Sequence, residues 1–167
     1  MRFLYLHGFA SGPLSRKAQF FRERFEERGL VLEVPAMDEG DFEGLTITGQ
    51  LRLVERMAGG EPCSLIGSSM GGYVAALYAA RHPEVRKLVM LAPAFYFPKR
   101  WEENLDPAKS EAWKRTRKMS VMHYSDGQMR DIGYQLVEDG IQYEPAPNVT
   151  QPALIFHGSK DDVVPVA

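Results

Sequence analysis

The sequence of 167 residues has one cysteine, four histidines and no long apolar run. The single cysteine, Cys63, excludes an internal disulfide framework and indicates a reducing compartment. We interpret Cys63 as a small buried core residue. The apolar stretch before His7 is too short for a signal peptide, and no stretch reaches the roughly 18 apolar residues of a membrane span. We therefore expect a soluble, cytoplasmic protein.

Neither positive nor negative residues are in large excess, because the net charge is −2. This balance gives no sign of a nucleic-acid or membrane-surface partner. The composition, 44% hydrophobic and 25% charged, is that of an ordinary globular protein, and the length suits one domain. The sequence says nothing firm about assembly, and we expect a monomer or a weak homodimer.

Short apolar runs alternate with helical patterns along the chain, which predicts an α/β fold. Most of the runs show little alternation, as expected for strands buried on both faces of a parallel sheet. The predicted strands are residues 3–6, 30–34, 63–66, 88–91 and 153–156. The predicted helices are residues 15–29, 46–59 and 70–82. This order implies a parallel sheet with helices on both sides and right-handed crossovers.

About 60 residues separate the last two predicted strands, and this segment is rich in charged and aromatic residues. It has helical stretches near residues 107–119 and 126–139. Because loops of this length in a compact domain are usually functional, we interpret residues 96–150 as a helical lid over one end of the sheet. A structural insertion that only covers the surface is the alternative.

The stretch "GSSMGG" at residues 67–72 has the pattern Gly-x-Ser-x-Gly between a predicted strand and a predicted helix. That context is typical of a sharp turn that presents a nucleophilic serine. Ser69 occupies the central position, whereas Ser68 does not. Glycines at positions 67 and 71 relieve crowding in the turn. The following helix directs backbone N–H groups and a partial positive charge at a reacting carbonyl.

The loop after the first predicted strand, "LHGFASG" at residues 6–12, can supply a second backbone donor. We assign the oxyanion hole to the backbone N–H groups of Phe9 and Met70. We interpret the His7 ring as ordering this loop rather than transferring protons.

A carboxylate follows the last predicted strand in "FHGSKDDVVP", residues 156–165. An acid after the nucleophile fits the chain order serine, then acid, then histidine. Asp161 and Asp162 are both candidates, and we favour Asp161 because it stands at the better turn position. The alternative for either residue is a solvated turn carboxylate.

Together these residues resemble the alpha/beta-hydrolase superfamily, in particular its small single-domain bacterial serine esterases. The resemblance rests on "YLHGF" at 5–9, "GSSMGG" at 67–72 and "HGSKDDVVP" at 157–165, and it covers essentially the whole chain. It implies a three-layer alpha/beta-hydrolase fold, an attack by Ser69 on an ester carbonyl, and an acid at Asp161. No metal or organic cofactor is implied.

The histidine that would complete the triad is missing from the sequence after Asp161, where only six residues remain. His82 lies at the far end of the helix that starts at Ser69, about 18 Å away at about 1.5 Å per residue. We assign His7 to the oxyanion loop and His157 to the last turn. His123, in the predicted lid, is the weakest remaining candidate, because it would lack Asp161 as a partner.

We therefore expect a C-terminally truncated domain whose catalytic histidine, strand and helix lie beyond Ala167, about 25 to 45 residues further on. Such a chain would be nearly inactive. The leading hypothesis is a carboxylesterase or thioesterase that acts on a small acyl ester through an acyl-enzyme. A non-catalytic binding protein on the same fold is the alternative. Peptide, lactone or carbon–carbon bond hydrolysis is a weaker third possibility.

Overall fold

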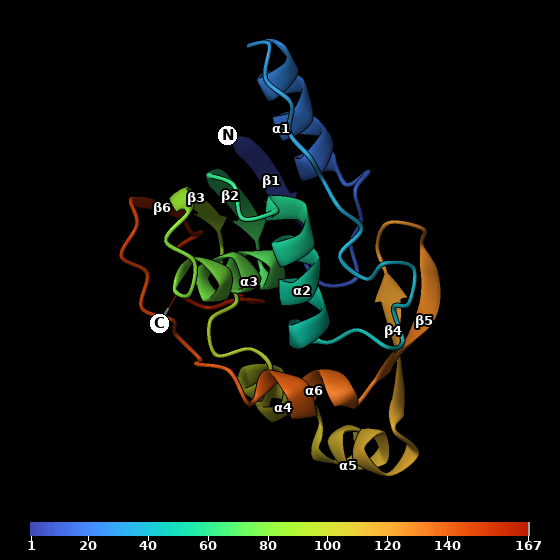
Figure 1. Ribbon diagram of the computed structural model, residues 1–167. Helices are drawn as coiled ribbons and strands as arrows, with labels where there is room; N and C mark the ends of the chain where they lie inside the picture. Colours follow the sequence, from blue (N-terminus) through green and yellow to red (C-terminus); the bar gives the residue numbers. More distant parts are fainter. Residues whose placement is uncertain (167) are drawn as a thin grey trace.

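The computed structural model describes residues 1–166, and its centre is a parallel sheet of four strands (Figure 1). The strands are β1 (Arg2–Leu6), β2 (Cys63–Ser68), β3 (Val85–Leu91) and β6 (Ala153–Phe156), in the order β1-β2-β3-β6. All three neighbouring pairs are parallel. Four of the five predicted strands are thus present, and the predicted parallel sheet is confirmed.

The prediction of a strand at residues 30–34 is wrong. Within this run only Glu33 pairs with β1, through a bridge to Leu4. The Glu33 carbonyl accepts from the Tyr5 amide at 2.8 Å, and the Glu33 amide donates to the Phe3 carbonyl at 2.9 Å. The segment runs beside β1 without a longer ladder, and its apolar side chains led to the wrong prediction.

Three helices pack on the sheet, and their ends follow the local sequence. Helix α1 (Arg16–Glu26) begins after Ser15, whose hydroxyl accepts from the Ala18 amide. Helix α2 (Ile47–Ala58) begins after Thr46 and ends at Gly59, which adopts a left-handed conformation with φ 62°. Helix α3 (Met70–Ala79) is buried along its whole length, as its apolar sequence predicts.

The two faces of the sheet are covered unequally (Figure 1). Helices α2 and α3 pack with β1, β2 and β3 in the larger core cluster. Helix α1 covers the other face near β1, where Ala18 packs against Tyr5 and Ile66. All four residues of β6 are exposed, and Leu154 retains 53% of its accessible surface. The sheet is therefore well packed at its centre and open at β6.

The segment between β3 and β6 contains three short helices and a β-hairpin. They are α4 (Lys99–Asn104), α5 (Pro107–Thr116), β4 (Lys118–His123), β5 (Gln128–Gly133) and α6 (Gln135–Gly140). The predicted helix near 107–119 corresponds to α5. The predicted helix at 126–139 is wrong, because residues 128–133 pair antiparallel with β4 and only residues 135–140 are helical. The turn sequence Asp126-Gly127, with Gly127 at φ 68°, is the hairpin signal.

Aromatic side chains form the core of this segment. Trp113 is 1% exposed, and its indole N–H donates to the Ile132 carbonyl at 3.0 Å. Its ring meets those of Trp101 and Tyr134 edge-on, with centroids 5.0 and 5.2 Å apart. These three aromatic residues therefore stabilise the segment itself. Within residues 1–166, no helix is both long and apolar enough to cross a membrane.

Candidate active site

Ser69 lies at the turn from β2 into α3 and has an unusual backbone, with φ 54° and ψ −120°. Non-glycine residues with positive φ are uncommon and are held in place by their surroundings. The Ser69 amide donates to the Leu91 carbonyl at 2.9 Å, and the Ser69 carbonyl accepts from Ala94 at 3.0 Å. The same carbonyl accepts from Gly72 and Tyr73 at 2.9 and 3.1 Å. The turn is therefore fixed to β3 and to the first turn of α3.

Two glycines permit this close approach, each for its own reason. A methyl group at position 67 would lie 2.6 Å from the Cα of Gly72 and would also collide with the Gly71 carbonyl. A methyl group at position 71 would lie 2.6 Å from the His7 carbonyl oxygen and would collide with the carbonyl of Leu6. Gly67 thus relieves the turn, as the sequence predicts, whereas Gly71 relieves the contact between α3 and the end of β1.

Phe9 and Met70 flank Ser69 with backbone amides that are available to a ligand. Both residues line a cavity together with Ser69. Among the residues that the structure describes, neither amide donates a hydrogen bond to a protein group. Met70 is the first residue of α3, where an N–H group has no partner within the helix. Phe9 and Met70 therefore lie beside Ser69 with backbone amides that lack a protein partner among the described residues.

His7 is buried under the loop that carries Phe9, and both of its ring nitrogens are occupied. Its Nε2 accepts from the Met37 amide at 3.1 Å, and its Nδ1 lies 3.0 Å from the Gly8 carbonyl oxygen. Nδ1 is therefore the protonated nitrogen of a neutral ring. Burial lowers the pKa of His7, against the smaller effect of the Gly8 carbonyl. These contacts fix the loop and leave the ring without a free nitrogen.

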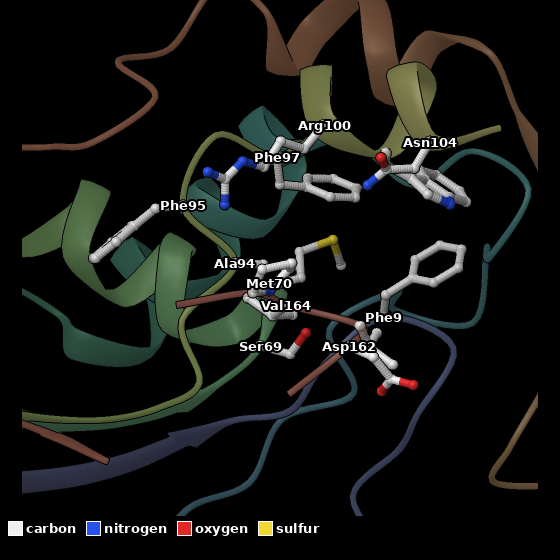
Figure 2. Close-up of a pocket in the computed structure, with 13 residues that line it drawn as sticks. Phe9, Ser69, Met70, Ala94, Phe95, Phe97, Arg100, Asn104, Asp162 and Val164 are labelled. Atoms are coloured by element: carbon white, nitrogen blue, oxygen red, sulfur yellow. The ribbon is translucent and has the colours of Figure 1, made fainter. Parts of the chain in front are cut away.

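Ser69 forms part of the floor of a cavity of about 420 Å³ (Figure 2). Its walls are mostly apolar. They include Phe9 and Met70 from the site and Phe97 and Trp101 from the 96–150 segment. The Phe9 and Trp101 ring centroids are 4.7 Å apart. The segment thus contributes the wall opposite Ser69.

Two polar side chains of α4, Arg100 and Asn104, also line this cavity (Figure 2). The Arg100 guanidinium lies 5.1 Å from the centre of the Tyr96 ring. Neither residue is predicted from the sequence to belong to the site. The spacing of four residues places both on one helix face, but nothing in the sequence shows that this face is directed at Ser69.

The structure places the two candidate acids differently. Asp162 lines the apolar cavity with Ser69. Asp161 lies in the turn behind it, where its Oδ1 accepts from the amides of Val163 and Val164 at 3.1 and 2.9 Å. The amide of Val164 is the main reason why the pKa of Asp161 lies below its usual range. Asp161 is therefore a carboxylate whose second oxygen, Oδ2, has no hydrogen bond to a donor of residues 1–166.

The other three histidines are engaged away from Ser69. The Nε2 of His157 lies 2.6 Å from the Val164 carbonyl and 3.8 Å from Asp161 Oδ2, so His157 belongs to the same turn. His82 stacks on Tyr78 at 3.8 Å, at the far end of α3. His123 contacts Ser125 through Nδ1 at 2.9 Å. None of these three histidines lines a described cavity that contains Ser69.

Solved structures share this architecture over nearly the whole chain. Alpha/beta hydrolase domain-containing protein 10 from mouse is 20% identical, with a TM-score of 0.78 over 98% of this chain and 70% of that chain. Est1E from Butyrivibrio proteoclasticus, solved with ferulic acid bound, is 22% identical, with a TM-score of 0.76 over 97% and 70%. A monoacylglycerol lipase from Paleococcus ferrophilus is 16% identical, with a TM-score of 0.71 over 97% and 74%.

These likenesses confirm the alpha/beta-hydrolase fold that the sequence motifs predict. No curated protein matches the chain by sequence. A family model, described as "Uncharacterised protein family (UPF0227)", matches residues 2–167. The match spans the parallel sheet, the Ser69 turn and the turn that carries Asp161. The chain therefore belongs to the uncharacterised protein family UPF0227 and has the alpha/beta-hydrolase fold.

Proposed function

We propose that the protein is a serine hydrolase that cleaves a small acyl ester or thioester through an acyl-enzyme intermediate. The observation that carries this proposal is the Ser69 turn. A serine is held at positive φ between two backbone amides without protein partners, on the floor of a cavity. A turn that served only to connect a strand and a helix would not need this strain.

The chemistry follows from the positions of these groups. The Ser69 Oγ forms a bond to the acyl carbon, and the negative charge that develops on the carbonyl oxygen is stabilised by the Phe9 and Met70 amides. Collapse of the tetrahedral intermediate releases the alcohol or thiol, which takes the proton that Ser69 gave up. A water molecule then attacks the acyl carbon, the bond to Ser69 Oγ breaks, the carboxylic acid leaves, and Oγ takes back a proton.

The proton transfers require a general base, and we propose a histidine from outside residues 1–167, oriented by Asp161. Asp161 suits this role because its Oδ1 is held by two backbone amides while Oδ2 stays available. The exposed β6 strand supports a neighbouring segment at this edge. Residues 1–167 alone would then be nearly inactive. Reading the gene past codon 167 tests this: an in-frame histidine supports it, and an immediate stop codon contradicts it.

The walls of the cavity favour an apolar acyl group. Its volume of about 420 Å³ and its aromatic lining suit a short alkyl or aryl chain, with residues 96–150 acting as a lid. Two structural neighbours point the same way, because one holds ferulic acid, an aromatic acid, and another is a monoacylglycerol lipase. Between ester and thioester the site gives no preference.

Chemical rescue tests the proposal on the chain as it stands. Imidazole can replace a missing histidine as a general base, so we expect it to accelerate hydrolysis of p-nitrophenyl esters by the protein, with saturation. Ser69→Ala should abolish this acceleration beyond the rate of imidazole alone. Ser64→Ala, on the same strand and away from both cavities, is the matched control. Full rescue in Ser69→Ala would overturn the proposal.

A non-catalytic binding protein is the second candidate. It is favoured because both ring nitrogens of His7 have protein partners and the other three histidines line neither cavity at Ser69. That alternative predicts equilibrium binding of esters in the apolar cavity without turnover, with or without imidazole. It also predicts that Ser69→Ala leaves this binding unchanged.

A further inference from the structure

A second cavity, of about 450 Å³, adjoins Ser69 and differs in chemistry from the first. Ser69 and Phe9 line both cavities, so a molecule bound at Ser69 has access to both. The walls of this second cavity, which we call the polar cavity, come from the loop after β1, the start of α1 and the hairpin turn between β4 and β5.

The charged side chains on the walls of the polar cavity are both basic. Arg16 and Lys17 line it, and none of its described lining residues is an aspartate or a glutamate. At the C-terminal end of α1 and just beyond it, Arg24 and Arg28 each lie within ion-pair distance of Glu27. Arg16 and Lys17, in contrast, form no ion pair with a carboxylate of residues 1–166. The cavity therefore holds two cations that the protein itself does not neutralise.

Hydroxyl groups add hydrogen-bond donors to this positive surface. Ser11, Tyr124 and Ser125 line the polar cavity. The hairpin reaches the cavity because the Tyr124 amide donates to the Ala10 carbonyl at 2.8 Å. A wall of ammonium, guanidinium and hydroxyl donors suits the oxygens of a carboxylate or a phosphate.

Lys17 connects this surface to the reacting serine. Its ammonium donates to the Ser68 hydroxyl at 3.1 Å, which places a positive charge beside the residue that precedes Ser69. The same charge contributes to the low pKa of Asp161, although the backbone amide of Val164 is the largest cause. Because Asp161 lies outside the polar cavity lining, Lys17 remains available to a bound anion.

We propose that the polar cavity binds an anionic group, a carboxylate or a phosphate, carried on the leaving group of the substrate. Which part of the substrate enters which cavity rests on the proposed function. The apolar cavity takes the acyl chain, so the alcohol or thiol on the other side of the scissile bond extends toward Lys17 and Arg16. The substrate is then an ester with an apolar acid and an anionic alcohol or thiol.

Matched esters with one acyl group test the proposal in the imidazole-rescued reaction. The substrates are phenyl acetate, 4-acetoxybenzoate and 4-acetoxyphenyl phosphate, whose leaving groups are neutral, carboxylate and phosphate. We expect Lys17→Gln to lower kcat/KM for an anionic ester about tenfold and to leave that for phenyl acetate within about twofold. Arg28→Gln, which removes an equal charge just beyond the C-terminal end of α1, is the control. Lys17→Arg should keep most of the preference.

Binding of the leaving groups provides a readout that needs no turnover. Nuclear magnetic resonance titrations of Ser69→Ala with phenol, 4-hydroxybenzoate and 4-hydroxyphenyl phosphate measure it directly. The anionic ligands should bind about tenfold more tightly than phenol, with a dependence on Lys17 and on salt. The better of the two anions identifies the group.

The outcomes separate the two proposals. Selective anion binding that depends on Lys17, without any ester turnover, retains the polar cavity as an anion site and overturns the hydrolase. Turnover with equal effects of Lys17→Gln and Arg28→Gln on all three esters, together with equal binding of phenol and the anions, overturns the anion site and retains the hydrolase.

Discussion

The two halves of the candidate site are held in opposite ways. Ser69 stands between β2 and α3, where every residue of α3 is buried and glycines allow backbone to touch backbone. Asp161 follows β6, whose four residues are all exposed. Its carboxylate is held by two amides of its own turn. Ser69 is therefore positioned by the core of the protein, and Asp161 by a local turn.

Ser69 and Asp161 therefore differ in what keeps them in position. A serine fixed by tertiary packing keeps its geometry as long as the domain is folded. A carboxylate in the turn after an exposed strand keeps its place through a few local hydrogen bonds. Four sets of substitutions test this contrast between Ser69 and Asp161.

The largest effect is expected at the nucleophile. Ser69→Ala should reduce the imidazole-rescued rate at least about a thousandfold, because the bond to the acyl carbon can no longer form. Steady-state kinetics with p-nitrophenyl acetate measure it, and thermal unfolding should be nearly unchanged. A rate within tenfold of that of the unsubstituted protein would show that Ser69 is not the nucleophile.

A pair of identical truncations compares the packing of the two halves. Leu77 in α3 is fully buried, whereas Leu154 in β6 is 53% exposed. Leu77→Ala should lower the free energy of unfolding by about 2–5 kcal/mol, and Leu154→Ala by less than about 1 kcal/mol. Urea denaturation of the two variants measures both values. Equal losses would contradict the contrast.

The acid is expected to have a smaller effect in the rescued reaction. Asp161→Asn should lower the rate about tenfold, because an amide orients and stabilises a protonated imidazole less well than a carboxylate does. The loss should appear as a weaker increase of the hydrolysis rate with imidazole concentration. Asp162→Asn, in the adjacent position, should change that dependence little. The opposite ranking would assign the role to Asp162.

The smallest effect concerns the pH dependence of the packed half. Burial lowers the pKa of His7, so the unfolded chain binds a proton that the folded protein resists. Stability is then complete above the unfolded value of about 6.5 and falls as the pH drops through it toward the folded value. Urea midpoints at about pH 7.5 and 5.5 should differ more for the unsubstituted protein than for His7→Gln. An equal shift would mean that the fold does not lower the pKa of His7.

The sequence predicted the parts of the fold that depend on local pattern. The strands of the sheet and helices α1, α2 and α3 follow from apolar periodicity, and the Ser69 turn follows from its two glycines. The run at 30–34 has the composition of a strand, but whether it pairs depends on its approach to β1. The hairpin of β4 and β5 was not predicted, although Asp126-Gly127 between them is a typical hairpin turn sequence.

The residues that line the cavity could not be predicted from the sequence. Trp101 and Arg100 line the site because residues 96–150 fold back over Ser69, and that placement depends on contacts between distant parts of the chain. Lys17 likewise meets Ser68 across 51 positions of sequence. Sequence motifs predicted Ser69 as the nucleophile, whereas the residues around it follow only from the tertiary structure.

Covalent labelling tests the central claim, that Ser69 is a nucleophile, most directly. The protein would be incubated with a fluorophosphonate, with and without imidazole, and the modified peptide located by mass spectrometry. We predict a single adduct at Ser69 that forms faster with imidazole and is missing from Ser69→Ala. Unmodified Ser69 in the presence of imidazole, or equal labelling of Ser69→Ala, would contradict the account.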